Sequence, residues 1–224
     1  MFKSETSMVK PVVKWMESMH LSVKCEFITP WGICDLVGLS FRKTSVNDRR
    51  RLGQSQAISS VTRAALLFRI PDDRTLTLQR LVRECAPTIP EETVIEHAER
   101  LIADGFVRRS GDRLQRLNGW VPLHKRLIAI ELKRSRVEEA MTQALNNLVF
   151  ADKSYVGLPK DLAIRVAAKG SRWSGFLDNG VGVLAVSPRD CTMVVPSRNR
   201  SSLPDPVVQF YCVEKFWRSF SRDS

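Results

Sequence analysis

The sequence lacks several features that mark common classes of protein. No apolar run approaches the roughly 18–20 residues that a membrane-spanning helix needs, so we expect no membrane association. The N-terminal segment has no uninterrupted apolar stretch followed by a small-residue cleavage site, which argues against a secretory signal. The 5 cysteines are scattered and never spaced as CxxC, which argues against a disulfide framework or a structural zinc site. We therefore expect a cytoplasmic protein with reduced thiols.

Positive charge is what the composition has in excess. Lys and Arg number 35 against 24 Asp and Glu, a formal net charge of +11. A positive potential attracts polyanions, and the release of counterions from phosphates supplies affinity that is independent of base sequence. Nucleic acid is therefore the first partner to consider. Many basic proteins bind no nucleic acid, so the charge indicates a function only when it is joined to a site.

Hydrophobic periodicity predicts an α/β protein. Apolar residues at helical spacing predict a first helix over 7–20, and two strand-like stretches follow, separated by Pro30. Near the middle of the chain, the apolar run 127–130 leads into Glu131-Leu132-Lys133. The remaining expected elements are strands over 21–28, 32–41, 154–158, 181–186 and 191–195, and helices over 136–150, 161–169 and 207–220.

The segment 42–54 is polar, rich in arginine and without an apolar period. Such a composition is typical of a linker or an exposed loop, so we predict a domain boundary here. Arg49, Arg50 and Arg51 would then be exposed and available to phosphates.

A different pattern follows the boundary. Helices are predicted over 56–68, 77–85 and 90–104, and the last of them ends at Gly105. Two short strands then flank the turn Ser110-Gly111-Asp112. Three helices and a hairpin resemble a winged helix-turn-helix, and the run LIADGFVRRSGDRLQRL resembles the end of its third helix and its wing.

The charges of this module point in two directions. The wing is basic, which suits contact with phosphates or the minor groove. The third helix is acidic, which would repel a phosphate-lined groove, so packing against a protein is the alternative. The basic residues are Arg108, Arg109, Arg113 and Arg116, and the acidic ones are Glu91, Glu92, Glu96 and Glu99.

Two strands carry charges where strands are usually apolar. Asp35 interrupts an otherwise apolar strand, where an isolated charge is costly unless it is paired or bound to a metal. Glu131 and Lys133 alternate with Leu132, so both project to the same face of their strand. An ordinary ion pair at a strand end is the alternative interpretation of Glu131 and Lys133.

The order of these charged residues along the chain resembles that of the PD-(D/E)XK nuclease superfamily. The match consists of Glu17 on a first helix, Asp35 in a second strand, Glu131-Leu132-Lys133 at the end of a third strand, and Gln143 in the helix that follows. The resemblance implies a restriction-endonuclease-like mixed sheet flanked by helices. The long interval between Asp35 and Glu131 departs from the family, and the winged-helix segment accounts for it, because loop closure tolerates long insertions.

The resemblance also implies chemistry. Asp35, Glu131 and the Leu132 carbonyl would bind Mg²⁺ or Mn²⁺, and Lys133 would hold water or stabilise charge at phosphorus. Gln143 could orient a metal-bound water, although a plain helix-surface glutamine is the alternative. Glu17 could equally be an exposed carboxylate.

We therefore expect a metal-dependent nuclease that cleaves DNA, in which a winged helix helps to bind the substrate. The nuclease-like core would comprise 1–44 and 120–224, with the winged helix over 45–119. Two chains could pair to cut both strands of a duplex. The alternative is a catalytically inactive nuclease fold that binds DNA or acts as a scaffold, while the acidic third helix disfavours a transcription regulator.

Overall fold

The computed structural model describes residues 2–198 and 204–220. The chain divides into two compact units, each of which is built from separate segments of the sequence. The first comprises Met1–Ser40 and Lys125–Gln209, and the second comprises Phe41–His124 and Phe210–Ser224. The second unit therefore interrupts the first, as the long interval between Asp35 and Glu131 predicted.

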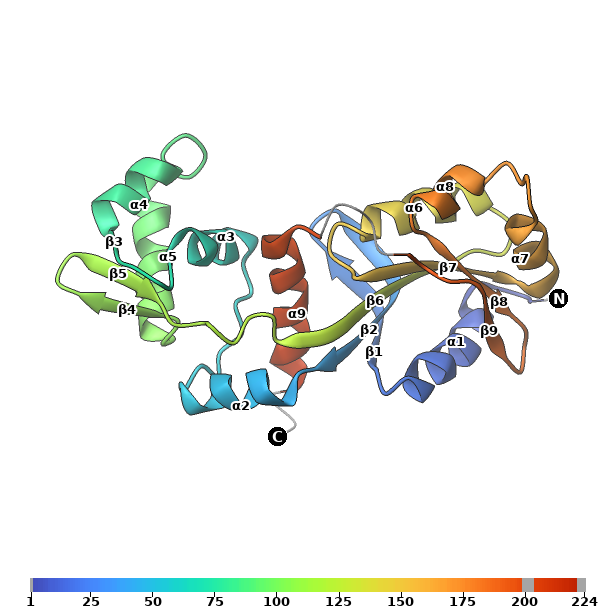
Figure 1. The fold of residues 1–224 in the computed structure, drawn as a ribbon, viewed down its shortest axis with the longest axis horizontal. Helices are drawn as coiled ribbons and strands as arrows, with labels where there is room; N and C mark the ends of the chain where they lie inside the picture. Colours follow the sequence, from blue (N-terminus) through green and yellow to red (C-terminus); the bar gives the residue numbers. More distant parts are fainter. Residues whose placement is uncertain (1, 199–203, 221–224) are drawn as a thin grey trace. The chain divides into compact units, whose positions relative to one another are not determined.

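The described residues of the first unit form a six-stranded mixed sheet of order β1-β2-β6-β7-β8-β9 (Figure 1). Strand β1 pairs with β2 in antiparallel fashion, β6, β7 and β8 run parallel, and β9 returns antiparallel to β8. The parallel strands need crossover connections, which helices supply. The strands are β1 (Ser22–Thr29), β2 (Gly32–Phe41), β6 (His124–Leu132), β7 (Lys153–Pro159), β8 (Gly182–Val186) and β9 (Cys191–Val195).

Helices cover both faces of this sheet. On one face, α1 (Thr6–Ser18) buries Met8, Val12 and Met16 in a cluster that also contains Ile130 and Leu132 of β6. On the other face, α6 (Val137–Asn147) and α7 (Lys160–Ala167) pack against β7 and β8. Because side chains alternate along a strand, Glu131 lies between two residues that face α1 and itself faces α6.

The second unit contains the predicted winged helix. Its described strands form a three-stranded antiparallel sheet of order β3-β5-β4, and three helices precede the β4–β5 hairpin. The side chains of Ser60 and Thr77 cap α3 and α4 by accepting from the backbone N–H groups of Arg63 and Arg80. The elements are α3 (Val61–Arg69), β3 (Leu76–Thr77), α4 (Leu78–Cys85), α5 (Glu91–Ala103), β4 (Val107–Ser110) and β5 (Arg113–Arg116).

The structure differs from the sequence-based predictions in four elements, one of which is the unpredicted two-residue strand β3. The segment 42–54 was predicted to be an exposed loop, but it contains the helix α2 (Lys43–Arg51). The short helix α8 (Ser174–Asp178) was not predicted. The terminal helix α9 (Pro206–Phe220) was assigned to the nuclease-like core, yet from Phe210 onward it belongs to the second unit.

The predicted α/β class is confirmed, as a mixed sheet flanked by helices with an inserted winged-helix domain. Among the described residues, no helix combines the length and the apolar character that crossing a bilayer requires.

Candidate active site

Glu131 is a buried carboxylate on the face of β6 that packs against α6. Its side chain is 2% exposed, and its Oε1 accepts a hydrogen bond of 2.7 Å from Asn147 Nδ2. Burial raises the pKa of Glu131 to about 7; the hydrogen bond from Asn147 opposes this shift, and the negative charge of Asp35 adds to it. The carboxyl group is therefore poised to change its protonation state near neutral pH.

Asp35 lies on β2, where its side chain reaches the backbone of β6. Its Oδ2 accepts a hydrogen bond of 2.7 Å from the Leu132 N–H, while Oδ1 has no hydrogen-bond partner in the described part of the chain. The N–H and C=O of one strand residue point to the same side, so the Leu132 carbonyl is directed toward β2 as well. Asp35, the Leu132 carbonyl and Glu131 are thus neighbours.

Lys133 follows two residues after Glu131 and is also buried, at 6% exposure. Its backbone N–H donates to Gly157 O on β7 at 3.2 Å, which fixes the strand end. Its Nζ lies 3.8 Å from Glu139 Oε1 on α6. A buried ammonium group with one distant carboxylate keeps most of its hydrogen-bonding capacity for other groups.

Three polar residues of α6 form a stripe, because Glu139, Gln143 and Asn147 are spaced by four residues and share one helix face. The first lies against Lys133 and the last donates to Glu131. Gln143 lies between them, and its Oε1 is buried with no hydrogen-bond partner among the described residues. Asn147 was not singled out in the sequence; its spacing from Gln143 was the available signal.

Cys34 lies beside this site. Asn147 Nδ2 is 3.5 Å from its Sγ. Burial, together with the charge of Glu131, raises the pKa of the Cys34 thiol well above its usual value. Without a metal ion the thiol is therefore neutral, so it is not an activated thiolate nucleophile.

Glu17 does not join the other predicted catalytic residues. It is exposed in the last turn of α1, the helix that packs against Ile130 and Leu132 on the face of the sheet opposite to Glu131. The described residues give its carboxylate no hydrogen bond or ion pair with Asp35 or Glu131. Of the two interpretations drawn from the sequence, the exposed carboxylate fits the structure.

The remaining residues fit a hard divalent cation. Two carboxylates and a carbonyl, from Asp35, Glu131 and Leu132, are oxygen donors, which Mg²⁺ and Mn²⁺ prefer. The described residues contain no group of three His, Cys, Asp or Glu residues that could hold a metal. A cation here would therefore take its other ligands from the Leu132 carbonyl, water or substrate.

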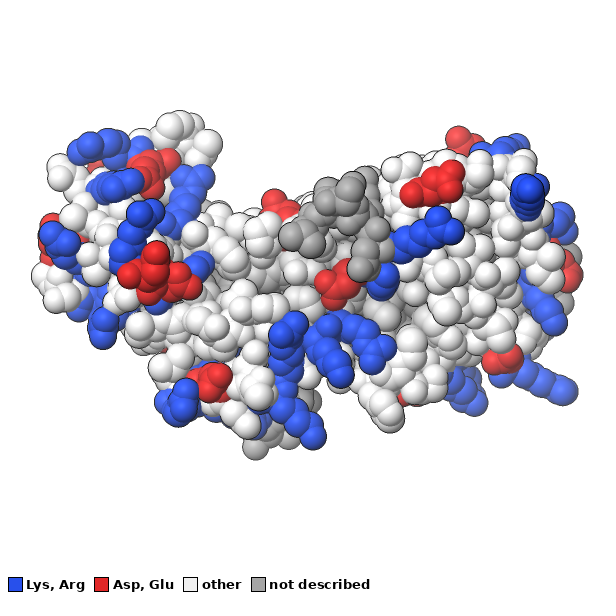
Figure 2. Space-filling model, viewed as in Figure 1, with Lys and Arg blue, Asp and Glu red and all other residues white. Residues whose placement is uncertain are grey.

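The wing arginines are only partly free to meet a polyanion. Arg109 Nη1 lies 2.6 Å from Glu99 Oε1, and Arg116 Nη2 lies 3.1 Å from Asp72 Oδ2. Arg108 donates to the Gln115 side chain, and the exposed Arg113 donates to Thr75 Oγ1 at 3.2 Å. Basic and acidic side chains are interspersed on the visible face of this unit (Figure 2).

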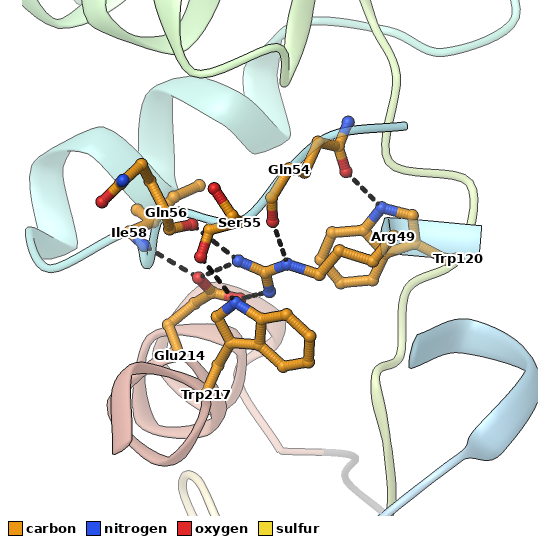
Figure 3. A network of polar contacts seen from close by, with 8 residues as sticks. All are labelled: Arg49, Gln54, Ser55, Gln56, Ile58, Trp120, Glu214 and Trp217. Atoms are coloured by element: carbon orange, nitrogen blue, oxygen red, sulfur yellow. Dashed lines mark hydrogen bonds and ion pairs between the residues drawn. The ribbon is translucent and has the colours of Figure 1, made fainter. Parts of the chain in front are cut away.

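Arg49 was predicted to contact nucleic acid from an exposed loop, and this prediction is wrong. The residue is 0% exposed and forms an ion pair with Glu214 inside the second unit (Figure 3). Its guanidinium carbon lies 4.3 Å from the Trp217 ring centroid and 4.8 Å from that of Trp120. Gln54 O accepts from its Nε at 2.8 Å. Arg49 therefore stabilises the core of the unit.

Arg50 and Arg51, the two other arginines predicted from this segment, are exposed on α2. Arg51 Nη2 lies 3.0 Å from Asp48 Oδ1, an exposed pair of a kind that contributes little to stability. Both guanidinium groups are thus at the surface, as predicted.

Comparison with known proteins assigns no family. No protein-family model and no curated protein sequence matches the chain. One solved structure is similar, the SPO1766 protein of unknown function from Silicibacter pomeroyi, with 10% sequence identity and a TM-score of 0.48. The match covers 99% of this chain and 89% of that chain.

Proposed function

We propose that the chain is a metal-dependent nuclease that cleaves phosphodiester bonds in DNA. The observation that carries the proposal is the meeting of Asp35 and Glu131 from adjacent strands beside the Leu132 carbonyl. Placing the half-buried carboxylate of Asp35 beside the buried one of Glu131 is unfavourable unless a proton or a cation offsets their charge. A divalent cation is the partner that would also bring phosphate to this site.

In this proposal the ion would be Mg²⁺ or Mn²⁺, which would polarise the scissile phosphate and lower the pKa of a bound water. Asp35, Glu131 and the Leu132 carbonyl would hold it. The Lys133 ammonium group would stabilise the negative charge that develops at phosphorus. Asn147 orients the Glu131 carboxylate, and the unpaired Oε1 of Gln143 could accept a hydrogen bond from water.

The second unit would bind the substrate. Arg113 of the wing is exposed and forms no ion pair in the described part of the chain, so its guanidinium group is available to a phosphate. Exposed arginines of this kind position a protein on the DNA backbone without reading its sequence. The net charge of +11 would add long-range attraction.

An inactive nuclease fold that only binds DNA is the second candidate, and the same site contains the observation that favours it. One oxygen of Asp35 is already bonded to the Leu132 N–H, and one oxygen of Glu131 to Asn147. These bonds compete with a metal for two of the four carboxylate oxygens. DNA would then bind without being cut.

The test is cleavage of labelled single-stranded, duplex and branched DNA with Mg²⁺ or Mn²⁺. Asp35→Asn keeps an acceptor for the Leu132 N–H but removes the charge, and Lys133→Met keeps the length of the side chain without the ammonium group. Each should lower the cleavage rate by about 10²–10³-fold, as for loss of one charge-stabilising group. Glu17→Gln, at an exposed carboxylate, is the control and should cut normally.

Two other outcomes are decisive. Binding of DNA without cleavage by the wild type under every metal condition would support the inactive candidate. Cleavage that survives both Asp35→Asn and Lys133→Met would place the active site elsewhere and contradict the assignment.

A further inference from the structure

The second unit contains a pocket that the proposed nuclease does not use. Its volume is about 680 Å³, within the range of roughly 300–1,000 Å³ that is typical of small-molecule sites. It lies between the segment that precedes α3, the first turn of that helix and the end of α5. The lining residues are Ser55, Gln56, Ala57, Ser59, Arg63, Arg100, Ala103, Asp104 and Arg218.

The charge of the lining is predominantly positive. Arg63, Arg100 and Arg218 contribute three guanidinium groups against the single carboxylate of Asp104. Arg100 also pairs with Glu96 on its own helix, at 3.0 Å, but both side chains are more than half exposed. Such a pair is weak in water, so Arg100 can exchange this partner for another anion.

Arg63 gives the pocket its specific chemistry. The residue is 8% exposed, and its Nε is buried without a hydrogen-bond partner in the described part of the chain. Its Nη1 is 3.7 Å from Asp104 Oδ2, beyond the distance of a good hydrogen bond. A buried charged group with incompletely paired N–H groups is costly, and an oxyanion bound to the exposed tenth of this side chain would offset its charge.

A neighbouring histidine is affected by the same positive charge. Burial lowers the pKa of His97, and the charge of Arg63 lowers it further. His97 is therefore neutral at physiological pH and adds no charge of its own beside the pocket. The local excess of positive charge comes from the arginines.

We propose that this pocket binds a phosphate group. Guanidinium groups bind phosphate oxygens through parallel hydrogen bonds, and a phosphate has enough oxygens to engage Arg63 together with Arg100 or Arg218. The group could belong to a free nucleotide or to a nucleic acid, because both present the same oxyanion. The inference goes beyond the proposed nuclease function, since it needs neither the metal site nor cleavage.

The test is a titration of the full chain with inorganic phosphate, followed in ¹H–¹⁵N spectra through the arginine Nε–H resonances. Sodium chloride at matched ionic strength is the blank. We expect a saturable shift of the Arg63 resonance, which is assigned by its loss in Arg63→Lys. Arg100→Gln and Arg218→Gln should each weaken binding by about fivefold, the equivalent of roughly 1 kcal/mol.

Arg83→Gln is the matched control, because it removes the same charge from an exposed residue of α4 that does not line the pocket. It should leave the phosphate affinity unchanged. The absence of a saturable shift, or equal weakening by Arg83→Gln and Arg100→Gln, would overturn the proposal. The two exposed arginines keep the test valid even if Arg63→Lys does not fold.

A second titration, in EDTA so that nothing is cut, identifies the source of the phosphate. If the pocket serves nucleic acid, a short duplex should shift the Arg63 resonance at a lower concentration than deoxyadenosine monophosphate does. The reverse order would identify a free nucleotide. A duplex and a mononucleotide that both leave the resonance unmoved would contradict phosphate binding here.

Discussion

At the scale of single residues, the central feature is a carboxyl group buried at 2% exposure with a pKa raised to about 7. The folded protein holds a proton on Glu131 more tightly than the unfolded chain does, because the ordinary pKa of a glutamate carboxyl group is 4.5. The stability that comes from this proton is complete below about pH 4.5, and it is lost as the pH rises through about 7. Charging the group while it is buried is what costs stability.

Glu131→Gln should therefore change how stability depends on pH. In metal-free protein, raising the pH from 4.5 to 8 should lower the unfolding free energy of the wild type by about 2–3 kcal/mol more than that of the variant. Urea denaturation in EDTA at several pH values measures this. Glu17→Gln is the control and should follow the wild-type profile, and a Glu131→Gln profile parallel to the wild type would contradict the shifted pKa.

Arg49 shows where prediction at the residue scale failed. Its sequence neighbours are polar and basic, so local composition predicted exposure. Its ion-pair partner Glu214 lies 165 residues further along the chain, and no local pattern connects the two. Asp35, Glu131 and Lys133 were recognised because each breaks an apolar strand, which is a local signal.

At the scale of elements, the ion pair of Arg49 and Glu214 links α2 to α9 inside the second unit. Glu214 Oε2 also accepts a hydrogen bond of 2.8 Å from the Ile58 N–H (Figure 3). Several partners that are distant in sequence thus converge on one carboxylate. The ion pair holds α2 against α9, although the sequence of α2 has no apolar stripe.

Glu214→Gln should destabilise the protein strongly, because it leaves the Arg49 charge buried without its counter-charge. We expect a loss of about 3–5 kcal/mol in the free energy of unfolding. Asp48→Asn removes the exposed partner of Arg51 on the same helix and should cost less than about 1 kcal/mol. Chemical denaturation of both variants gives the comparison, and equal losses would argue against a buried pair.

The start of β8 depends on the absence of a side chain at Gly182. A Cβ there would overlap Tyr155 Cδ1 and would lie 2.7 Å from the Ser197 backbone nitrogen. Gly182→Ala should therefore cost about 1–3 kcal/mol through overpacking. Gly175→Ala, in α8 with no atom within 4 Å of the new Cβ, should be neutral or slightly stabilising. Thermal unfolding of the two variants tests this, and similar melting temperatures would contradict the contact.

Most elements were predictable because their signals are local. Strand β2 was expected over 32–41 and spans Gly32–Phe41, and the wing was found from its glycine turn. The helix α2 and the position of α9 were missed because contacts distant in sequence decide them. In the candidate site, the polar stripe on α6 could be placed opposite Glu131 only once the packing of that helix on the sheet was known.

At the scale of the whole molecule, the net charge of +11 is the property that bears on partners. It is not concentrated on the wing, where Arg109 and Arg116 are paired with acidic residues. The interval between Asp35 and Glu131 was interpreted as an inserted unit; residues 41–124 belong to the second unit, which also takes in the chain from Phe210 onward. How the two carboxylates meet could not be read from that interval.

If the wing contacts the DNA backbone, Arg113→Gln should weaken duplex binding equally for all sequences. The slope of log affinity against log salt concentration should fall by about one unit, as for the loss of one phosphate contact. Arg80→Gln is the control, since it removes the same charge from α4, outside the wing. Fluorescence anisotropy at several salt concentrations measures both variants. An unchanged slope for Arg113→Gln would show that the wing does not touch phosphate.

The claim on which the account depends is that Asp35 and Glu131 together bind a divalent cation. Electron paramagnetic resonance of free Mn²⁺ titrated with protein at pH 8 tests it directly, without requiring a substrate. The account predicts that the wild type and Glu17→Gln remove Mn²⁺ from solution saturably, whereas Asp35→Asn and Glu131→Gln do not. Equal Mn²⁺ binding by the wild type and Asp35→Asn would contradict it.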